Sequence, residues 1–249
     1  MPLRAALPSP GAPQAGEVQL WCLALPQLAA LAPHCAALLD DAEAQQAARF
    51  HFERDRLRHV LVHGVLRHLL GEALGVAAAG LQWQVGAQSK PALAPGAHTD
   101  LRFNLSHAGD WFYLALAVGR ELGVDVERQR PEIVDELLPS LNFTRAERAW
   151  IESHGGPARS PAFFAAWSRK EAAIKAWGTG LSLALDRFDI TPGLLRITPL
   201  AAPAELAAAS AAWTLRDLPA PAGYSAALVA EGEPPVLHLF GHDTGVGTG

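Results

Sequence analysis

The sequence predicts an α+β fold in which two similar α/β halves pack as a pseudo-dimer, and three observations predict it. The chain has 249 residues, 50% of them hydrophobic, which is enough for a sizeable core in one large domain or two small ones. A run of strands and helices in the first half returns in the same order in the second. The echo extends to detail, because Leu101–Phe103 before Gly109–Trp111 resembles Trp213–Leu215 before Ala222–Tyr224. A single mixed α/β domain would give much the same pattern, so that alternative stays open.

The first half is predicted to span residues 17–121. Its opening segment alternates apolar and polar residues like a half-buried strand, and helical spacing follows it. The predicted strands and helices, in order, are Glu17–Leu23, the helices Asp40–Glu53 and Asp55–Leu74, and the strands Leu81–Val85, Leu101–Leu105 and Trp111–Val118.

The second half is predicted to span residues 122–240, with the boundary near Glu121. Thr144 and Glu147 form a capping box at the start of one helix, and Gly178 ends the next. Residues 1–16 and 241–249 read as flexible ends because they are rich in Pro or Gly. The predicted elements are the strand Leu122–Glu127, the helices Thr144–Ser153 and Pro161–Trp177, and the strands Phe188–Ile190, Leu195–Thr198, Trp213–Leu218 and Tyr224–Val229.

Composition and charge exclude several classes of protein. The net charge of −5 and the pI near 6.0 argue against broad nucleic-acid binding, so no nucleic-acid partner is expected. No signal peptide and no apolar run of membrane-spanning length is found, so we expect no membrane partner and a cytoplasmic location. The two cysteines, Cys22 and Cys35, are expected to be buried thiols; a disulfide is the unsupported alternative.

The segment Gly123–Glu127 carries the first chemical motif. On a strand, side chains alternate between faces, so Asp125 and Glu127 share one face while Val124 and Val126 share the other. Taken alone, such an Asp-x-Glu is usually a solvent-facing strand edge.

The segment Trp167–Lys175 carries the second. On a helix, Glu171 and Lys175 are four residues apart and lie on one stripe. A solvated ion pair of small stabilising value is the plain alternative. Three carboxylates and an ammonium in one place are costly unless a cation and a phosphate sit there, which indicates magnesium-assisted phosphoryl chemistry.

Two further features fit a phosphate ligand. The loop Phe103–Trp111 has Asn, Ser and His side chains that would hold phosphate oxygens, although an ordinary capped turn explains it as well. Five arginines also crowd a helical region, where a solvated face is the usual explanation: Arg49, Arg54, Arg56, Arg58 and Arg67.

With these motifs together, the chain resembles the 4′-phosphopantetheinyl transferases, specifically the surfactin-synthetase-activating type. The resemblance runs from about Gln45 to Leu185. It rests on Gly123–Glu127, on Trp167–Lys175 and on Phe103–His107, which match the family's motifs in the right order. Members of this type are single-chain pseudo-dimers of about this length, so a working monomer is expected.

The resemblance implies a reaction and a metal site. The enzyme would move the 4′-phosphopantetheine arm of coenzyme A onto a serine of an apo acyl or peptidyl carrier protein and release 3′,5′-ADP. The implied Mg²⁺ ligands are Asp125, Glu127 and Glu171. Glu171 is also the candidate base for the carrier serine, directly or through a water, and Glu147 competes for that role. Lys175 completes the set of candidate catalytic residues.

The resemblance also implies how coenzyme A is held. Lys175 and His107 would hold its phosphates with Ser106 beside them. Basic contacts to the 3′-phosphate fall on Arg49 and Arg58. The residues near the adenine end are Lys90 and Pro91.

The chain departs from the family at two positions. Ser89 stands where the family often has glycine before Lys-Pro, which puts a close backbone approach in doubt. Thr179 stands where the family often has lysine, which puts a phosphate or carrier contact in doubt. Neither position is one of the proposed metal ligands.

Two other functions compete. One is a non-catalytic module that binds coenzyme A or a carrier protein. The other is a zinc hydrolase using His59 and His63 at i, i+4, which lacks the glutamate of His-Glu-x-x-His and an evident third ligand. The sequence does not identify the carrier, the pathway it serves or the tolerance for acylated coenzyme A.

Overall fold

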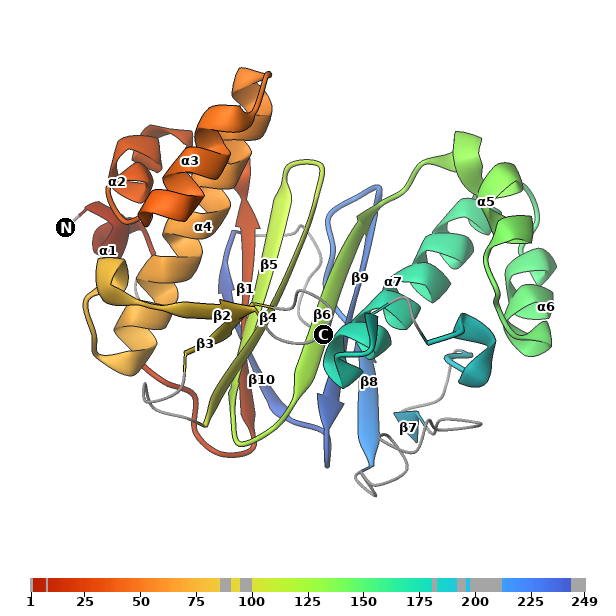
Figure 1. Cartoon of the computed structure of the whole chain (residues 1–249). Helices are drawn as coiled ribbons and strands as arrows, with labels where there is room; N and C mark the ends of the chain where they lie inside the picture. Colours follow the sequence, from red (N-terminus) through yellow and green to blue (C-terminus); the bar gives the residue numbers. More distant parts are fainter. Residues whose placement is uncertain are drawn as a thin grey trace.

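The structure is a computed structural model that describes residues 2–7, 9–85, 91–94, 100–180, 183–191, 196–197 and 212–242. Strands and helices are mixed along the chain and are not regularly alternating, so the predicted α+β class is confirmed. Two four-stranded sheets face each other, and helices cover the outer face of each (Figure 1).

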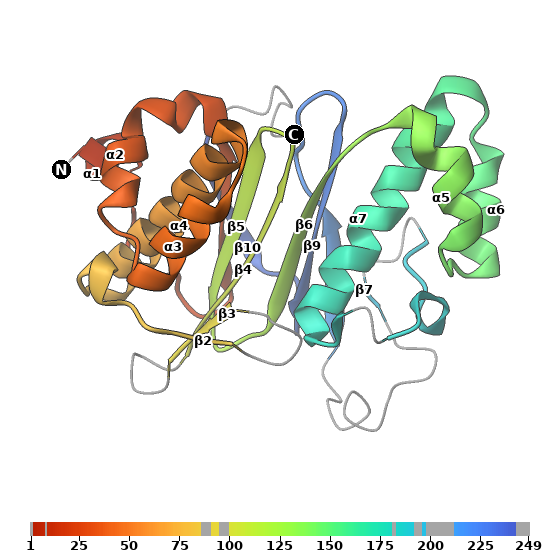
Figure 2. The same ribbon diagram turned by 45° about the horizontal axis from the view of Figure 1, so that its top comes forward.

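The first sheet has the strand order β10-β1-β5-β4. Strands β1, β5 and β4 pair antiparallel, and β10 pairs parallel with β1. The outer face is covered by α4, and α1, α2 and α3 pack against α4 (Figure 2). The strands and helices of this half are α1 (Pro2–Ala6), β1 (Glu17–Ala24), α2 (Ala32–Ala36), α3 (Asp41–Arg49), α4 (Glu53–Leu74), β4 (Leu101–Ala108), β5 (Trp111–Val118) and β10 (Val236–Gly241).

The second sheet has the order β6-β9-β8-β7, and all its pairs are antiparallel. Its outer face is covered by α7, with α5 and α6 farther out (Figure 1). These elements are β6 (Leu122–Arg128), α5 (Val134–Ser140), α6 (Arg145–Ser153), α7 (Arg159–Trp177), β7 (Arg196–Ile197), β8 (Trp213–Asp217) and β9 (Tyr224–Glu231). A separate two-stranded sheet joins β2 (Trp83–Val85) and β3 (Pro91–Leu93).

Three hydrophobic clusters hold these layers together. One lies under α4, one lies under α7, and the third fills the space between the two sheets. Val124 and Val126 belong to the third cluster, so the odd-numbered side chains Asp125 and Glu127 lie on the α7 side of β6. The predicted alternation along this strand is therefore confirmed.

The chain termini differ from the prediction. Residues 2–6 form α1, and Leu3 and Leu7 are buried against the first half, so this part of the expected flexible lead is packed. At the other end, β10 hydrogen-bonds into the first sheet, although it was placed in the second half. His242, in the expected flexible tail, donates its backbone N–H to the Cys22 carbonyl at 2.9 Å. A strand whose partner lies over 200 residues away cannot be placed from local pattern.

No helix in the described part of the chain is long and apolar enough to cross a membrane. Cys22 and Cys35 are free and buried, as expected. Burial raises the pKa of Cys35 to about 11.

Candidate functional site

The candidate site lies where β4 of the first sheet meets β6 of the second, beside α7. These two strands are the edges of their sheets and run next to each other (Figures 1 and 2). The Asn104 side chain links them, since its Oδ1 accepts the Val124 backbone N–H at 2.8 Å. We call the polar side chains gathered here the seam cluster: Ser106, Asp125, Glu127, Glu171 and Lys175.

Lys175 is the centre of the seam cluster. Its Nζ donates to Asp125 Oδ1 at 2.6 Å, to Ser106 Oγ at 3.0 Å and to the Val124 carbonyl at 3.3 Å. Ser106 Oγ in turn donates to Asp125 Oδ1 at 2.8 Å. One ammonium therefore connects a helix, β4 and β6.

Asp125 retains an oxygen for a ligand. The residue is only 2% exposed, and its Oδ2 has no hydrogen-bond partner among the described residues. Leaving a buried carboxylate oxygen unpaired costs free energy, so the arrangement fits a cation that would bind there.

The two glutamates add negative charge around Asp125. Glu127 accepts a hydrogen bond from Trp167 Nε1 at 3.0 Å. Burial, and then the charge of Asp125, raise the pKa of Glu127 to about 7. The same two causes raise the pKa of Glu171. A raised carboxyl pKa means that too little positive charge lies nearby to stabilise the ionised form. A divalent cation bound there would supply that charge.

These carboxylates are not already arranged as a metal cage. Within the described ranges, no three His, Cys, Asp or Glu side chains form a group that could hold a metal ion as they stand. In this arrangement Lys175 engages Oδ1 of Asp125. A cation would therefore use the remaining carboxylate oxygens.

Gly123 explains how the helix comes so close to the strand. A Cβ at this position would lie 2.1 Å from the Ala172 carbonyl oxygen and 2.4 Å from the Ala176 nitrogen. Only glycine allows this approach, which carries Glu171 and Lys175 over β6. Gly123 of the first motif thus packs directly against Ala172 of the second motif and against Ala176, which follows it.

His107, which follows Ser106 on β4, feels the charge of basic side chains from the first half. The pKa of His107 is lowered by partial burial and then by the positive charges of Arg58 and Lys175, so these groups lie near one another. Arg58 is half-buried on α4, 3.8 Å from Asp55, whereas Arg49 is exposed at the end of α3. Lys90 lies outside the described residues, and Pro91 is described as part of β3 without its side chain.

Glu147 is not part of the site, which corrects its prediction as a candidate base. It is fully buried, and its Oε1 pairs with Lys170 Nζ at 2.7 Å and accepts the Ile190 N–H at 2.8 Å. Its Oε2 accepts the Thr144 N–H at 2.8 Å in the predicted capping box. A carboxylate so engaged inside the protein is a structural ion pair and not a base for an external serine.

Asn104 is a second correction. It was expected to contribute to a phosphate-binding loop, but it is 7% exposed, and its Oδ1 is engaged by β6. The segment around it is strand β4, and the turn proper begins at Gly109, whose φ is 54°.

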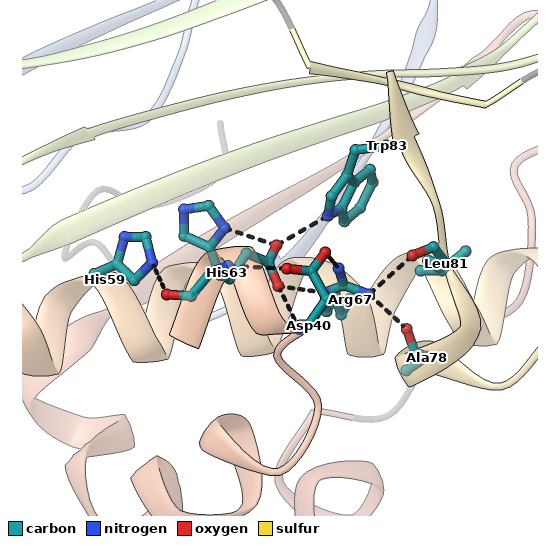
Figure 3. Close-up of polar contacts among 8 residues, drawn as sticks. Asp40, His59, His63, Arg67, Ala78, Leu81 and Trp83 are labelled. Carbon is teal, nitrogen blue, oxygen red and sulfur yellow. Dashed lines mark hydrogen bonds and ion pairs between the residues drawn. The ribbon is translucent and has the colours of Figure 1, made fainter. Parts of the chain in front are cut away.

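The structure also places a buried polar group in the first half that sequence reasoning missed (Figure 3). Arg67 was grouped with solvated arginines, yet it is fully buried. Its Nε donates to Glu43 Oε2 at 2.6 Å, its guanidinium also pairs with Asp40, and Nη1 donates to the Leu81 carbonyl at 3.0 Å. We call this group the closed cluster: Asp40, Glu43, His63, Arg67 and Trp83.

The closed cluster also accounts for the histidines of the zinc hypothesis. His63 Nδ1 bonds Glu43 Oε1 at 3.0 Å, and His59 Nε2 bonds the Glu43 carbonyl at 3.1 Å (Figure 3). One ring nitrogen of each imidazole is thus hydrogen-bonded to an oxygen of Glu43, which does not favour zinc ligation by the pair. The local signal that was available is the capping box Asp40–Glu43, which brings both acids to the start of α3.

Comparison with known proteins gives one consistent family. Residues 26–118 match the family described as "4'-phosphopantetheinyl transferase, N-terminal", and residues 121–229 match the "4'-phosphopantetheinyl transferase superfamily". The chain is 34% identical to the 4′-phosphopantetheinyl transferase HetI of Nostoc sp. over 203 residues, covering 81% of this chain and 82% of HetI. It is 30% identical to a 4′-phosphopantetheinyl transferase of Bacillus subtilis over 146 residues, covering 59% of this chain and 63% of that protein. It is 40% identical over 93 residues to 4′-phosphopantetheinyl transferase AcpT of Salmonella typhi, covering 37% of this chain and 47% of AcpT.

Proposed function

We propose that this chain, which belongs to the 4′-phosphopantetheinyl transferase family, transfers the 4′-phosphopantetheine group of coenzyme A to a serine of an acyl or peptidyl carrier protein. The observation that supports this proposal is the seam cluster, where the buried Asp125 keeps an unpaired oxygen beside the ammonium of Lys175. Such a place suits a cation together with the phosphates of a substrate.

Asp125, Glu127 and Glu171 would hold the Mg²⁺ ion. Their oxygens are the donors that this ion prefers, and burial followed by the negative charge of Asp125 raises the pKa of both glutamates. When bound, Mg²⁺ would neutralise charge on the pyrophosphate of coenzyme A.

The first half would hold the phosphates. Lys175 and Ser106 meet in the seam cluster, and His107, on the other face of β4, feels the charge of Arg58, so a pyrophosphate would meet donors from both halves. Arg49 and Arg58 would contact the 3′-phosphate, and Lys90 and Pro91 the adenine end, as the family resemblance implies.

Glu171 is the candidate base. The hydroxyl of the carrier serine would attack the phosphorus that bears the pantetheine arm, and the bond from that phosphorus to 3′,5′-ADP would break. The serine proton would pass to Glu171, directly or through a water. The pKa of Glu171 is raised, which suits a group that must accept a proton in the transition state.

The arrangement of the chain favours the surfactin-synthetase-activating type. In this proposal the α3/α4 half and the α7 half are related as a pseudo-dimer, divided near Glu121, and form a single site between them. One chain then supplies both sides of the site and works as a monomer in the cytoplasm. Carriers of fatty-acid, polyketide or nonribosomal-peptide synthesis are the candidate partners.

The test is a panel of apo carrier proteins incubated with coenzyme A and Mg²⁺ and followed by intact mass. We expect at least one carrier to gain the phosphopantetheine mass, with release of 3′,5′-ADP, and no gain when a chelator is added. Tight binding of coenzyme A without labelling of any carrier would instead support the non-catalytic module.

A further inference from the structure

Strand β6 presents a free edge to β4. In the antiparallel pairing of β6 with β9, alternate peptide groups point away from the partner strand, and β6 is the first strand of its sheet. The backbone groups of Val124 lie on that free edge, because its N–H and its C=O are both used by side chains. Buried backbone groups need such partners.

Two side chains from different parts of the chain form hydrogen bonds with the two backbone groups of Val124. Asn104 on β4 accepts the Val124 N–H at 2.8 Å, and Lys175 on α7 donates to the Val124 carbonyl at 3.3 Å. Asn104 is 7% exposed, and Val124 is fully buried. The next residue along β6 is Asp125, so its position depends on how this edge is held.

We propose that Asn104 is a positioning residue that sets the register of β6 against β4 and thereby holds Asp125 opposite Ser106. This inference rests on the proposed function. Asn104 lies two residues before Ser106 and three before His107 on β4, while Val124 directly precedes Asp125 on β6. The bond to the Val124 N–H therefore ties the backbone of β6 to β4, one residue before the side-chain bond from Ser106 Oγ to Asp125 Oδ1.

The carboxamide is suited to this task because its bond adds no charge beside the acids. Backbone ladder bonds do not join β4 to β6, since the two strands belong to different sheets. Asn104 takes the place of a ladder bond at one position and fixes the offset of the two strands there. A shift of about 1 Å between groups that must hold one substrate typically costs about a hundredfold in rate.

The variant Asn104→Ala tests the proposal against a matched control. Thr214→Val also removes a buried side-chain hydrogen bond, from Thr214 Oγ1 to the Ala230 carbonyl at 3.2 Å, but between β8 and β9 at a position whose β6 partner is Leu122 and not a residue of the seam cluster. Both variants lose one buried polar contact, so their melting temperatures should fall by similar amounts. Asn104→Asp keeps the acceptor oxygen and serves as the conservative variant.

Three measurements are made on each variant. Hydrogen exchange by NMR reports whether the Val124 amide is protected, calorimetry with Mg²⁺ present gives the Kd for coenzyme A, and carrier labelling gives kcat. For Asn104→Ala we expect loss of protection at Val124, a Kd raised about tenfold and a kcat lowered about a hundredfold. Thr214→Val should leave all three unchanged, and Asn104→Asp should retain the protection of Val124.

The outcomes separate this inference from the proposed function. If the wild-type chain labels no carrier, the proposed function fails, while the exchange and calorimetric results still decide the role of Asn104. If the wild-type chain is active and Asn104→Ala matches it in Kd and kcat, the inference is overturned. Equal losses in Asn104→Ala and Thr214→Val would also overturn it, because they would trace to general destabilisation.

Discussion

The seam cluster and the closed cluster contain similar chemistry and differ in how completely it is paired. In the closed cluster, the fully buried Arg67 meets Asp40 and Glu43, and Trp83 Nε1 donates to Glu43 Oε1 at 2.9 Å. In the seam cluster, Lys175 meets Asp125 on one oxygen only, and the other oxygen has no partner within the described structure.

The pKa values of the two clusters move in opposite directions. Burial alone would raise the pKa of Glu43, but hydrogen bonds from His63 and Arg67 outweigh it and lower the pKa to about 2. At Glu127, burial acts together with the charge of Asp125 and raises the pKa to about 7. In the closed cluster the buried charges are paired by neighbouring side chains. In the seam cluster a ligand would complete the pairing. This difference distinguishes an acidic group whose charges are paired inside the fold from one whose charges a ligand would balance.

The largest expected effect is loss of turnover in Asp125→Asn. The substitution keeps the shape of the side chain but removes the charge that would bind a cation, so we expect kcat to fall by on the order of 10³. The melting temperature should change less than turnover, since the ion pair with Lys175 becomes a hydrogen bond to Oδ1 while the repulsion of Glu127 and Glu171 by Asp125 is relieved. Carrier labelling and a thermal scan measure the two effects.

The control for this variant is Glu53→Gln, which removes a carboxylate whose side chain is 71% exposed on α4. It should label carriers at the wild-type rate. Turnover by Asp125→Asn within a few-fold of wild type would contradict the metal-site proposal.

Breaking the closed cluster should produce the opposite pattern, with a large loss of stability and little loss of turnover by the folded protein. Arg67→Met leaves Asp40 and Glu43 without their buried cation, which we expect to lower the free energy of unfolding by about 3–5 kcal/mol. Arg56→Met, which removes an exposed ion pair with Glu53, should cost less than about 1 kcal/mol. Urea unfolding measures both, and equal losses in the two variants would show that the closed cluster is not a stabilising unit.

The sequence predicted the seam cluster far better than the closed cluster, and the reason is the range of the contacts. Asp125 and Glu127 follow from the period of a strand, and Glu171 and Lys175 from the period of a helix, so local pattern identifies them. Arg67 looked like one solvated arginine among several because its partners lie about 25 residues away on another helix.

Adjacent residues on one helix show the same limit. Lys170 and Glu171 are neighbours in sequence, yet Lys170 is fully buried against Glu147 while Glu171 faces Asp125. Local pattern places them on different faces of α7 but does not say what each face meets. For the same reason the bond from Asn104 to Val124 was not foreseen, since it depends on how two sheets are offset.

A smaller effect is expected in the pH dependence of stability. A carboxyl group whose pKa is lowered in the folded state stabilises the protein above its unfolded pKa of 4.5, and that contribution is lost as the pH falls toward 2. Glu43→Gln should therefore be less stable than wild type at pH 7, and the gap should narrow by about 3 kcal/mol as the pH falls through this window. Denaturant titrations at several pH values measure the gap. A gap that stays constant down to pH 2 would contradict the assignment of a lowered pKa to Glu43.

The smallest expected effect concerns two arginines of the first half, Arg49 and Arg58. Arg58 is half-buried and lies close enough to lower the pKa of His107, whereas Arg49 is exposed at the end of α3. A partly buried charge is screened less by water and salt, so Arg58→Ala should raise the Kd for coenzyme A about tenfold and Arg49→Ala about threefold or less. Raising the salt concentration should weaken binding of wild type more than binding of Arg58→Ala, because the variant has already lost the stronger contact. Calorimetry at two ionic strengths measures this difference. Equal effects of the two substitutions would contradict this expectation. They would mean that both arginines reach the 3′-phosphate from similar environments, despite their different burial.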